Sequence, residues 1–233
     1  MGRVIAIANQ KGCVGKTTTA SNLAASLAAN EMSVLVLDMD PQGNCTTGLG
    51  VAKVPGMPTI YEALMGTRNL DQMIVNTEFD GLRLIPADKN LVAGNLDLVD
   101  IDRREFRLKD ALEPIRNLHD FILIDCPPAL DLLTVNAMVA ADSVLVPIQC
   151  EFFALEGISQ LLDTMDRLRE SLQPNLKLEG VLLTMYDERT NLTRQVASDL
   201  REFFQDQVFQ TIIPRSIRLA EAPSFGKPIL SYD

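Results

Sequence analysis

The feature of this chain that most constrains its fold is a short loop near the N-terminus, rich in glycine, lysine and threonine. Residues 9–18 read N-Q-K-G-C-V-G-K-T-T, directly after an apolar run at Val4–Ala8 and at the start of a helix-like stretch at Thr17–Ala29. The apolar run predicts a buried strand, and the stretch rich in Ala, Leu and Ser predicts a helix. A strand, a loop of small residues and a helix in this order form the context that a phosphate-binding loop requires.

The chemistry of this loop favours a nucleotide phosphate site over a plain turn before a helix. Consecutive backbone N–H groups and the positive end of a helix dipole converge on phosphate oxygens, and small residues let the backbone approach closely. We expect Lys16 to neutralise the β- and γ-phosphates and Thr17 to offer its hydroxyl to Mg²⁺. Gln10 stands where the generic pattern has its first glycine. The loop residues expected at the phosphates are Gly12, Cys13, Val14, Gly15, Lys16, Thr17 and Thr18.

Apolar runs that alternate with helical patterns predict an α/β fold. The chain has 233 residues, 47% hydrophobic content and no linker-like segment, so we expect a single P-loop domain over residues 1–233. Short runs of Val, Ile and Leu with few aromatic residues are typical of a buried parallel sheet. The prediction is a doubly wound, mostly parallel sheet flanked by helices. The candidate strands are Val4–Ala8, Ser33–Leu37, Leu82–Pro86, Phe121–Asp125, Ser143–Ile148, Gly180–Met185 and Val208–Ile213.

Several other classes of protein find no support in the sequence. No apolar stretch reaches the ~20 residues of a membrane helix, and the N-terminus lacks a signal-peptide pattern, so we expect a cytoplasmic protein with no membrane partner. The four cysteines have no C-x-x-C spacing, which argues against a disulfide framework or a zinc site. The one histidine, His119, is interpreted as a helix-end residue and not as a catalytic base.

Acidic residues follow two of the candidate strands. Asp38 and Asp40 come directly after Ser33–Leu37, and Asp125 ends the strand at Phe121. In open α/β sheets ligands gather at the carboxyl ends of the strands, so we interpret these carboxylates as part of the nucleotide site and not as turn residues alone. Asp40 is the candidate for orienting the attacking water, Asp38 for a second carboxylate near the magnesium shell, and Asp125 for the Walker B residue that holds Mg²⁺.

Together these motifs resemble the ParA/Soj-type partition ATPases, in the deviant Walker A family that also contains MinD. The matching runs follow the family's order over nearly the whole chain, and together they are highly specific. They are N-Q-K-G-x-V-G-K-T-T at 9–18, L-D-M-D-P-Q-G-N at 37–44, L-I-D-C-P-P at 123–128, P-I-Q-C-E-F-F-A-L-E-G at 147–157, T-M-Y-D-E-R-T-N-L at 184–192 and I-P-R-S-I-R-L-A-E-A-P-S at 213–224.

The resemblance implies a switch driven by ATP and Mg²⁺. ATP closes two subunits into a homodimer, the dimer binds double-stranded DNA without sequence preference, and slow hydrolysis stimulated by a ParB-like centromere-binding protein releases it. The family's signature lysine corresponds to Lys11, which is expected to cross the interface to the partner's phosphates and to take part in catalysis. Pro214 and Ser216 match positions near the adenine, and Met185 is expected near the same base. A nucleoid-associated protein is implied.

The charge of the chain bears on DNA binding. The net charge is −10, which opposes a general attraction to phosphate backbones, but residues 189–233 carry six basic and five acidic side chains. This segment is therefore the least unfavourable surface, and its cations gain effect when a dimer doubles them. Each of them could instead be an ordinary solvated arginine or lysine. The candidates for DNA contact are Arg189, Arg194, Arg215, Arg218 and Lys227.

Two departures from the family pattern affect these expectations. Cys13 stands where the family usually has glycine, so we expect weaker nucleotide binding or impaired closure than with glycine. The sequence stops at Asp233, where relatives commonly continue into a final helix.

Two alternatives stay open: a ParA-like positioning ATPase for a cargo other than DNA, and a metallocluster or reductase-type relative of the same fold, for which the cysteine pattern gives no convincing support.

Overall fold

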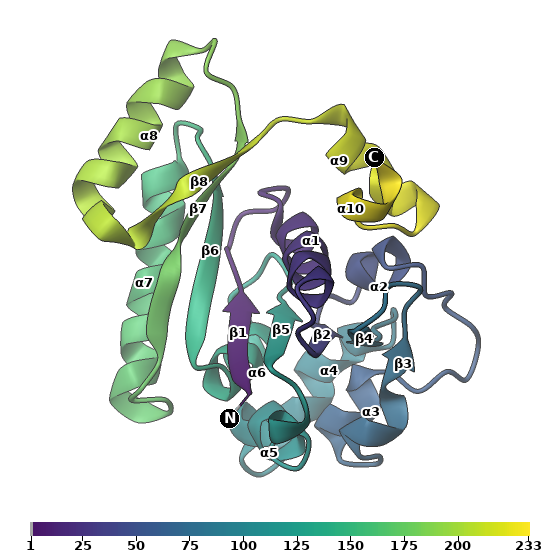
Figure 1. Cartoon of the computed structure of the whole chain (residues 1–233). Coiled ribbons are helices and arrows are strands. Elements are labelled where there is room, and N and C mark those ends of the chain that lie inside the picture. The colour runs from purple at the N-terminus through teal and green to yellow at the C-terminus, as the bar shows by residue number, and fades with distance from the viewer. Residues whose placement is uncertain (1) are drawn as a thin grey trace.

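The computed structural model describes residues 2–233, which form an eight-stranded sheet in the order β3-β4-β2-β5-β1-β6-β7-β8 (Figure 1). Every neighbouring pair is parallel except β3 and β4, which are antiparallel. The doubly wound α/β fold predicted from the sequence is thus confirmed. The strands are β1 (Arg3–Ile7), β2 (Val34–Asp38), β3 (Val75–Asn76), β4 (Leu82–Ile85), β5 (Phe121–Asp125), β6 (Ser143–Gln149), β7 (Lys177–Tyr186) and β8 (Val208–Pro214).

Helices cover both faces of the sheet because successive strand residues point to opposite sides. In β1, Val4 and Ala6 pack into the core on one face, and Ile5 and Ile7 into the core on the other. The first face is covered by α3 to α8, and the second by α1 and α2. The α-helices are α1 (Lys16–Ala29), α2 (Asn44–Gly48), α3 (Ile60–Met65), α4 (Leu91–Asp97), α5 (Arg107–Leu112), α6 (Leu132–Ala140), α7 (Ala154–Ser171), α8 (Asn191–Phe204), α9 (Ile217–Glu221) and α10 (Ile229–Tyr232).

Six short 3₁₀ helices complete the secondary structure of the described residues, mostly in the connections between strands and helices. They are η1 (Leu70–Met73), η2 (Leu98–Asp100), η3 (Arg104–Phe106), η4 (Arg116–Leu118), η5 (Gln205–Gln207) and η6 (Ala222–Phe225). The last of them lies between α9 and α10 in an arm that follows β8 and crosses to the side of α1 (Figure 1). This arm brings the end of the chain beside its first helix, since Ile229 N–H donates to Asn22 Oδ1 at 2.7 Å.

The topology places the ends of three central strands level with one another. β1 lies between β5 and β6; the chain runs from β1 past β5 to β2 in one direction, and from β5 past β1 to β6 in the other. In the register of the sheet, Ile7 pairs with Asp125, and Asp125 pairs with Asp38. The carboxyl ends of β1, β2 and β5 therefore meet at the point where the strand order reverses, which is where open α/β sheets bind ligands.

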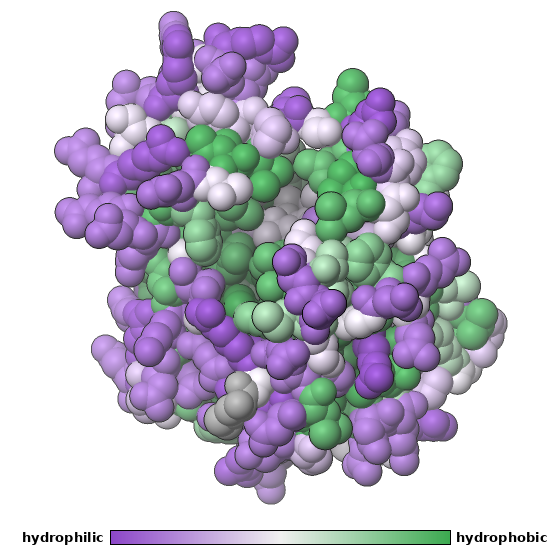
Figure 2. Space-filling view, viewed as in Figure 1, coloured by the Kyte–Doolittle hydropathy of each residue, from purple (hydrophilic) through white to green (hydrophobic). Residues whose placement is uncertain are grey.

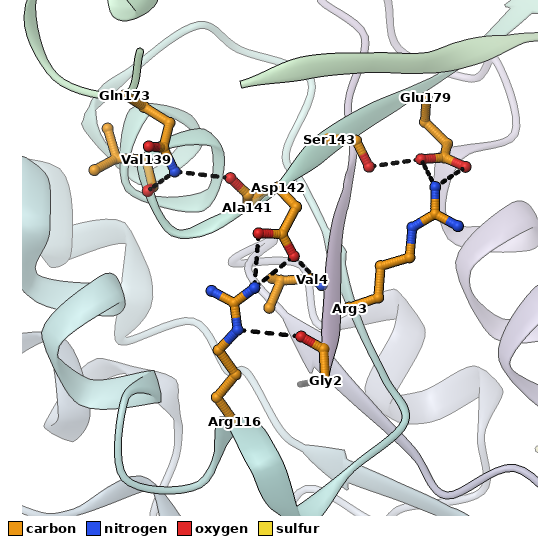
Figure 3. Close-up of polar contacts among 10 residues, drawn as sticks. All are labelled: Gly2, Arg3, Val4, Arg116, Val139, Ala141, Asp142, Ser143, Gln173 and Glu179. Carbon is orange, nitrogen blue, oxygen red and sulfur yellow. Dashed lines mark hydrogen bonds and ion pairs between the residues drawn. The ribbon is translucent and has the colours of Figure 1, made fainter. Parts of the chain in front are cut away.

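The amino ends of the central strands, on the side of the sheet away from the phosphate loop, are held together by a network around Asp142 (Figure 3). Arg116 Nη2 donates to both oxygens of Asp142, at 2.7 and 2.6 Å, and Arg116 Nε donates to the carbonyl of Gly2 at 3.1 Å. Asp142 Oδ2 also accepts from the backbone N–H of Val4 at 2.8 Å. One arginine and one carboxylate thus tie the segment before β5 to the start of β1 and to the turn before β6.

A second group in the same region ties β1 to β7 (Figure 3). Arg3 Nη2 donates to the two oxygens of Glu179, at 2.7 and 2.6 Å, and Ser143 Oγ donates to Glu179 Oε2 at 2.7 Å. Gln173 Nε2 donates to the carbonyls of Val139 and Ala141, both at 3.0 Å, and so joins the end of α7 to the end of α6. The amino ends of the strands are therefore cross-linked by polar side chains.

Within residues 2–233, no helix is both long and apolar enough to cross a membrane.

Candidate nucleotide site

The phosphate loop joins β1 to α1 and is fixed by side chains on both sides. Asn9 Nδ2 donates to the carbonyl of Pro147 at 2.7 Å, and Asn9 Oδ1 accepts from the backbone N–H of Lys11 at 3.0 Å. Thr184 Oγ1 donates to the carbonyl of Val14 at 2.8 Å. Gly15 has φ of 85° at the N-cap of α1, a left-handed conformation that glycine adopts without steric cost. The loop is thus preorganised, with the free N–H groups of α1 at its end.

Lys16 is buried at the start of α1, with 7% of its surface exposed. Its Nζ donates to the carbonyl of Lys11 at 2.8 Å, so the Lys16 side chain crosses the interior of the loop. Burial lowers the pKa of Lys16, while the nearby charge of Asp125 acts in the opposite direction. A buried ammonium that bonds only to a neutral carbonyl is under-compensated, and an anionic phosphate would supply the missing charge.

Thr17 and Asp125 form the part of the site that fits Mg²⁺. Thr17 Oγ1 donates to Asp125 Oδ2 at 2.7 Å. The other oxygen, Asp125 Oδ1, is buried and has no hydrogen-bond partner among residues 2–233. Burial, followed by the neighbouring charge of Asp38, raises the pKa of Asp125 well above its usual range. An unpartnered carboxylate oxygen beside a hydroxyl offers the kind of oxygen ligands that Mg²⁺ prefers, so these residues fit the ion.

The protein offers few ligands to this ion. No group of three or more His, Cys, Asp or Glu side chains suited to holding a metal occurs in the part of the chain that the structure describes. This is compatible with Mg²⁺, which is commonly held by one or two protein groups together with substrate phosphates and water.

Asp38 and Asp40 have different environments although they are two residues apart. Asp38 is fully buried, and its Oδ2 accepts from the backbone N–H and the hydroxyl of Thr46 at 2.8 and 2.7 Å. Its Oδ1 accepts from the backbone N–H of Asp40 at 3.1 Å. Burial raises the pKa of Asp38 to about 6, against the lowering effect of the Thr46 bonds. Both oxygens of Asp38 are engaged by the protein, so Asp38 shapes the loop that carries Asp40. Its place in the magnesium shell stays a prediction.

Asp40 lies at the wall of the cavity above the phosphate loop. Its Oδ1 accepts from the backbone N–H of Gln42 at 2.9 Å, and no hydrogen bond to its Oδ2 is found among residues 2–233. The side chain therefore has one oxygen fixed by the loop and one that can accept from a bound water. This position agrees with the role predicted for Asp40, which remains a prediction.

The cavity has a volume of about 1050 Å³ and is lined by the phosphate loop, α1, the ends of β7 and β8 and the arm with α9 and α10. Figure 2 shows it as a hollow flanked by apolar side chains within an otherwise polar surface. It has a polar part at the loop and an apolar part between α1 and strands β6 to β8, which is lined by Leu23, Leu145, Leu182 and Phe209. The volume is more than enough for a nucleotide.

The three residues predicted near the base line this cavity together with the phosphate loop. Met185 is the penultimate residue of β7 and has φ of 47°, a strained left-handed conformation for a methionine. Pro214 ends β8, and Ser216 is the N-cap of α9, where its Oγ accepts from the backbone N–H of Leu219 at 3.4 Å. The structure thus brings residues from the two ends of the chain to one cavity, and contact of these three with the base stays a prediction.

Not every predicted residue lies in the cavity. Gly12, Cys13, Gly15, Lys16, Thr17 and Thr18 line it. Val14 is buried with its carbonyl bound to Thr184, so only its backbone can serve the site. Lys11 lies outside the lining residues, with its side chain against α7. The anchoring roles of Asn9 and Thr184 were missed, although a polar residue at the end of an apolar run is a signal that could have found them.

The five predicted DNA-contact residues have different local partners. Arg189 and Arg215 both flank Asp187, and Arg189 binds it through two nitrogens at 2.8 and 2.6 Å. Arg194 bonds to Asn191 on α8, and Arg218 is paired with Asp233. Lys227 lines a separate hollow beside Leu49 and Phe79. Arg215 and Arg218 also line the nucleotide cavity. These five cations therefore lie in different local environments. Their contact with DNA remains a prediction.

A doubly wound parallel sheet with a phosphate loop at its switch point, a buried loop lysine and carboxylates at neighbouring strand ends defines a P-loop nucleoside triphosphatase. Comparison with known proteins narrows this class. Residues 2–178 match the family described as AAA domain. The chromosome partitioning protein ParA of Myxococcus xanthus is 54% identical over 100% of this chain and 82% of its own length. The sporulation initiation inhibitor protein Soj of Bacillus subtilis is 50% identical over 100% of this chain and 92% of its own.

A solved structure with the same fold contains a nucleotide and magnesium. Cobyrinic acid a,c-diamide synthase from Mycobacterium smegmatis, with a bound ATP analog and magnesium, is 38% identical with a TM-score of 0.87, over 97% of this chain and 93% of that one. The chain belongs to the ParA/Soj family of partition ATPases. It is therefore an ATPase whose cofactors are ATP and Mg²⁺.

Proposed function

We propose that ATP closes two copies of this chain into a dimer that binds duplex DNA without sequence preference, and that hydrolysis releases the DNA. A ParB-like centromere-binding partner would stimulate the slow hydrolysis, and nucleoid association would follow from the DNA binding. The observation that carries the proposal is the position of Lys11 in a chain of this family: Lys16 fills the interior of the loop, whereas Lys11 lies at its outer rim. A cation at the rim is suited to the phosphates of a second subunit.

The chemistry follows from the residues described above. Lys16 and the N–H groups at the start of α1 neutralise phosphate charge, and Thr17 with Asp125 would hold Mg²⁺, which adds positive charge at the phosphates. Asp40 orients a water for attack, and Asp38 holds Asp40 in place through the backbone N–H. Hydrolysis in such a site depends mainly on positioning and charge neutralisation, so each of these groups has a defined task.

The proposal is tested by binding of non-specific duplex DNA with ATP, with ADP and without nucleotide, in an Asp40→Ala background that slows turnover. We expect binding with ATP only, weakened by salt and by Arg189→Ala or Arg218→Ala. Arg103→Ala is the matched control, because Arg103 is also an exposed arginine paired with a carboxylate, on the opposite part of the molecule near α5. Equal losses in all three arginine variants would contradict a defined DNA surface, and nucleotide-independent binding would contradict the switch.

A positioning ATPase for another cargo is the second candidate, favoured by the net charge of −10. It predicts ATP-dependent dimerisation without DNA binding. Absence of DNA binding in every nucleotide state would favour this candidate or a loop impaired by Cys13. Restored binding in Cys13→Gly would identify the impaired loop as the cause.

A further inference from the structure

Lys11 is held against the first turn of α7 and is not among the residues that line the cavity. A Cβ added at Gly157 would lie 3.6 to 3.7 Å from the Cγ, Cδ and Cε atoms of Lys11, so the aliphatic stem packs in the space that the glycine leaves. The Nζ atom lies 5.4 Å from the centroid of the Phe153 ring. This distance is within the range of a cation–π interaction.

No carboxylate competes with the ring for this lysine. Among residues 2–233, Lys11 takes part in no ion pair and its side chain donates no hydrogen bond. A cation on an exposed aromatic face is held more weakly than one in a bidentate ion pair, and phosphate charge competes with the ring effectively. The contact thus favours one position of the Lys11 side chain, and it is weak enough for phosphate to displace the lysine from the ring.

The ring itself has a defined position. Phe153 is the N-cap residue of α7, and the N–H of Gly157 donates to its carbonyl at 3.1 Å. Phe152 packs edge-to-face against it, with ring centroids 5.0 Å apart and an interplanar angle of 85°. The site for Lys11 is therefore built from the start of a helix and an aromatic pair, and does not depend on the lysine being there.

We propose that Phe153 is a positioning residue that holds Lys11 against α7 in the nucleotide-free monomer and releases it when a partner's phosphates arrive. The inference rests on the proposed function, in which Lys11 acts across the dimer interface. Holding the lysine costs affinity in the dimer, because the contact with the ring must be broken in both subunits. The contact would thus set a threshold against dimerisation without ATP.

The holding contact is tested directly by NMR of the Lys11 ε-methylene protons, assigned with Lys11→Ala. Protons over a ring face are shifted upfield, so we expect an upfield shift in the nucleotide-free protein that Phe153→Leu removes. Phe203→Leu is the matched control: Phe203 is similarly exposed, 67% against 58% for Phe153, and also packs edge-to-face with its neighbour, but on α8. A shift that persists in Phe153→Leu would overturn the proposal.

The consequence is tested by the dimer dissociation constant in ATP. If two contacts are released per dimer, Phe153→Leu should strengthen association by about five- to thirtyfold, and Phe203→Leu should leave it unchanged. Weaker association in Phe153→Leu would overturn the proposal and mark the ring as part of the interface. If the wild-type protein did not dimerise with ATP, the proposed function would fail, whereas the NMR result would still decide whether Phe153 holds Lys11.

Discussion

Cys13 carries a cost that the sequence alone did not reveal. Its φ is 57°, a left-handed conformation that is strained for a residue with a Cβ, and its side chain is exposed at the phosphate loop. We expect Cys13→Gly to raise the free energy of unfolding by about 1 kcal/mol and to tighten ATP binding, because the strain and the added volume are both removed. Urea unfolding and nucleotide titration measure the two effects.

The control for this substitution is Glu31→Gly. Glu31 has φ of 62° just after α1, away from the cavity, so glycine there should relieve strain without changing ATP affinity. Unchanged ATP affinity and dimerisation in Cys13→Gly would show that the cysteine does not disturb the site.

His119 is predicted to make the protein less stable in mild acid. It is buried, its Nδ1 lies 3.2 Å from Ser33 Oγ, and its Nε2 has no hydrogen-bond partner within residues 2–233. Burial, followed by the charge of Arg83, lowers its pKa from the ordinary value of 6.5. The folded state thus binds fewer protons, so its stability is fully present above pH 6.5 and is lost as the pH falls from there toward the lowered pKa.

The measurement compares unfolding of the wild-type protein and of His119→Gln between pH 7.5 and 5. Burial of Asp38 acts in the opposite direction, since its raised pKa of about 6 gives stability at low pH that is lost as the pH rises toward that value. The difference between the two proteins isolates the histidine, because Asp38 is common to both. A wild-type stability that does not fall relative to His119→Gln on acidification would contradict the prediction.

At the level of elements, β7 is predicted to support the phosphate loop through Thr184. The threonine hydroxyl is buried and donates to the carbonyl of Val14. Thr184→Val keeps the shape but leaves this carbonyl unpaired, so we expect a loss of about 1–3 kcal/mol in stability together with weaker ATP binding. The control is Thr164→Val on α7, whose hydroxyl bonds to a helix carbonyl at an exposed position. ATP affinity equal to that of the control would contradict the anchoring role.

The elements themselves were largely predictable from the sequence. All seven expected strands occur, because long apolar runs leave few alternatives in a buried parallel sheet. β3 was missed, since it has only two residues, Val75 and Asn76, at the sheet edge. β7 begins three residues before the expected Gly180, with residues that are exposed or half-buried and so do not form an apolar run. Pattern reasoning is weakest where a strand is short or leaves the core.

The site was predictable where residues adjacent in the sequence also act together. The loop from Gly12 to Thr18 and the carboxylates at strand ends fall within short motifs, whereas the hydrogen bonds of Asn9 to Pro147 and of Thr184 to Val14 join residues more than a hundred positions apart. The end of α8 shows the same limit: Phe203 and Phe204 are adjacent and identical in type, yet Phe203 is 67% exposed and Phe204 is buried. Contacts of this kind depend on tertiary structure.

For the molecule as a whole, the Arg116–Asp142 pair is predicted to be a major support of the sheet. The Arg116 side chain is 15% exposed, and the pair joins three segments of the chain. Arg116→Met should lower the free energy of unfolding by about 1.5–3 kcal/mol, because the charge-assisted hydrogen bonds of the half-buried Arg116 to Asp142 and to the carbonyl of Gly2 are lost. Arg103→Met is the control, since its pair with Asp110 is exposed and should contribute about 0–1 kcal/mol. Similar losses in urea unfolding for both variants would contradict this ranking.

The central place of β1 in the sheet has a consequence for the newly made protein. β1 is translated before both of its neighbours, β5 and β6, so Arg3 cannot pair until Phe121 has been translated. At translation rates of roughly 5–20 residues per second, about 6 to 24 s pass before that partner is translated. During this interval the apolar strand β1 and the loop that follows it have no partner strand with which to pair. Slowed translation should therefore lengthen the time for which this apolar segment is exposed, and with it the tendency of the newly made chain to aggregate.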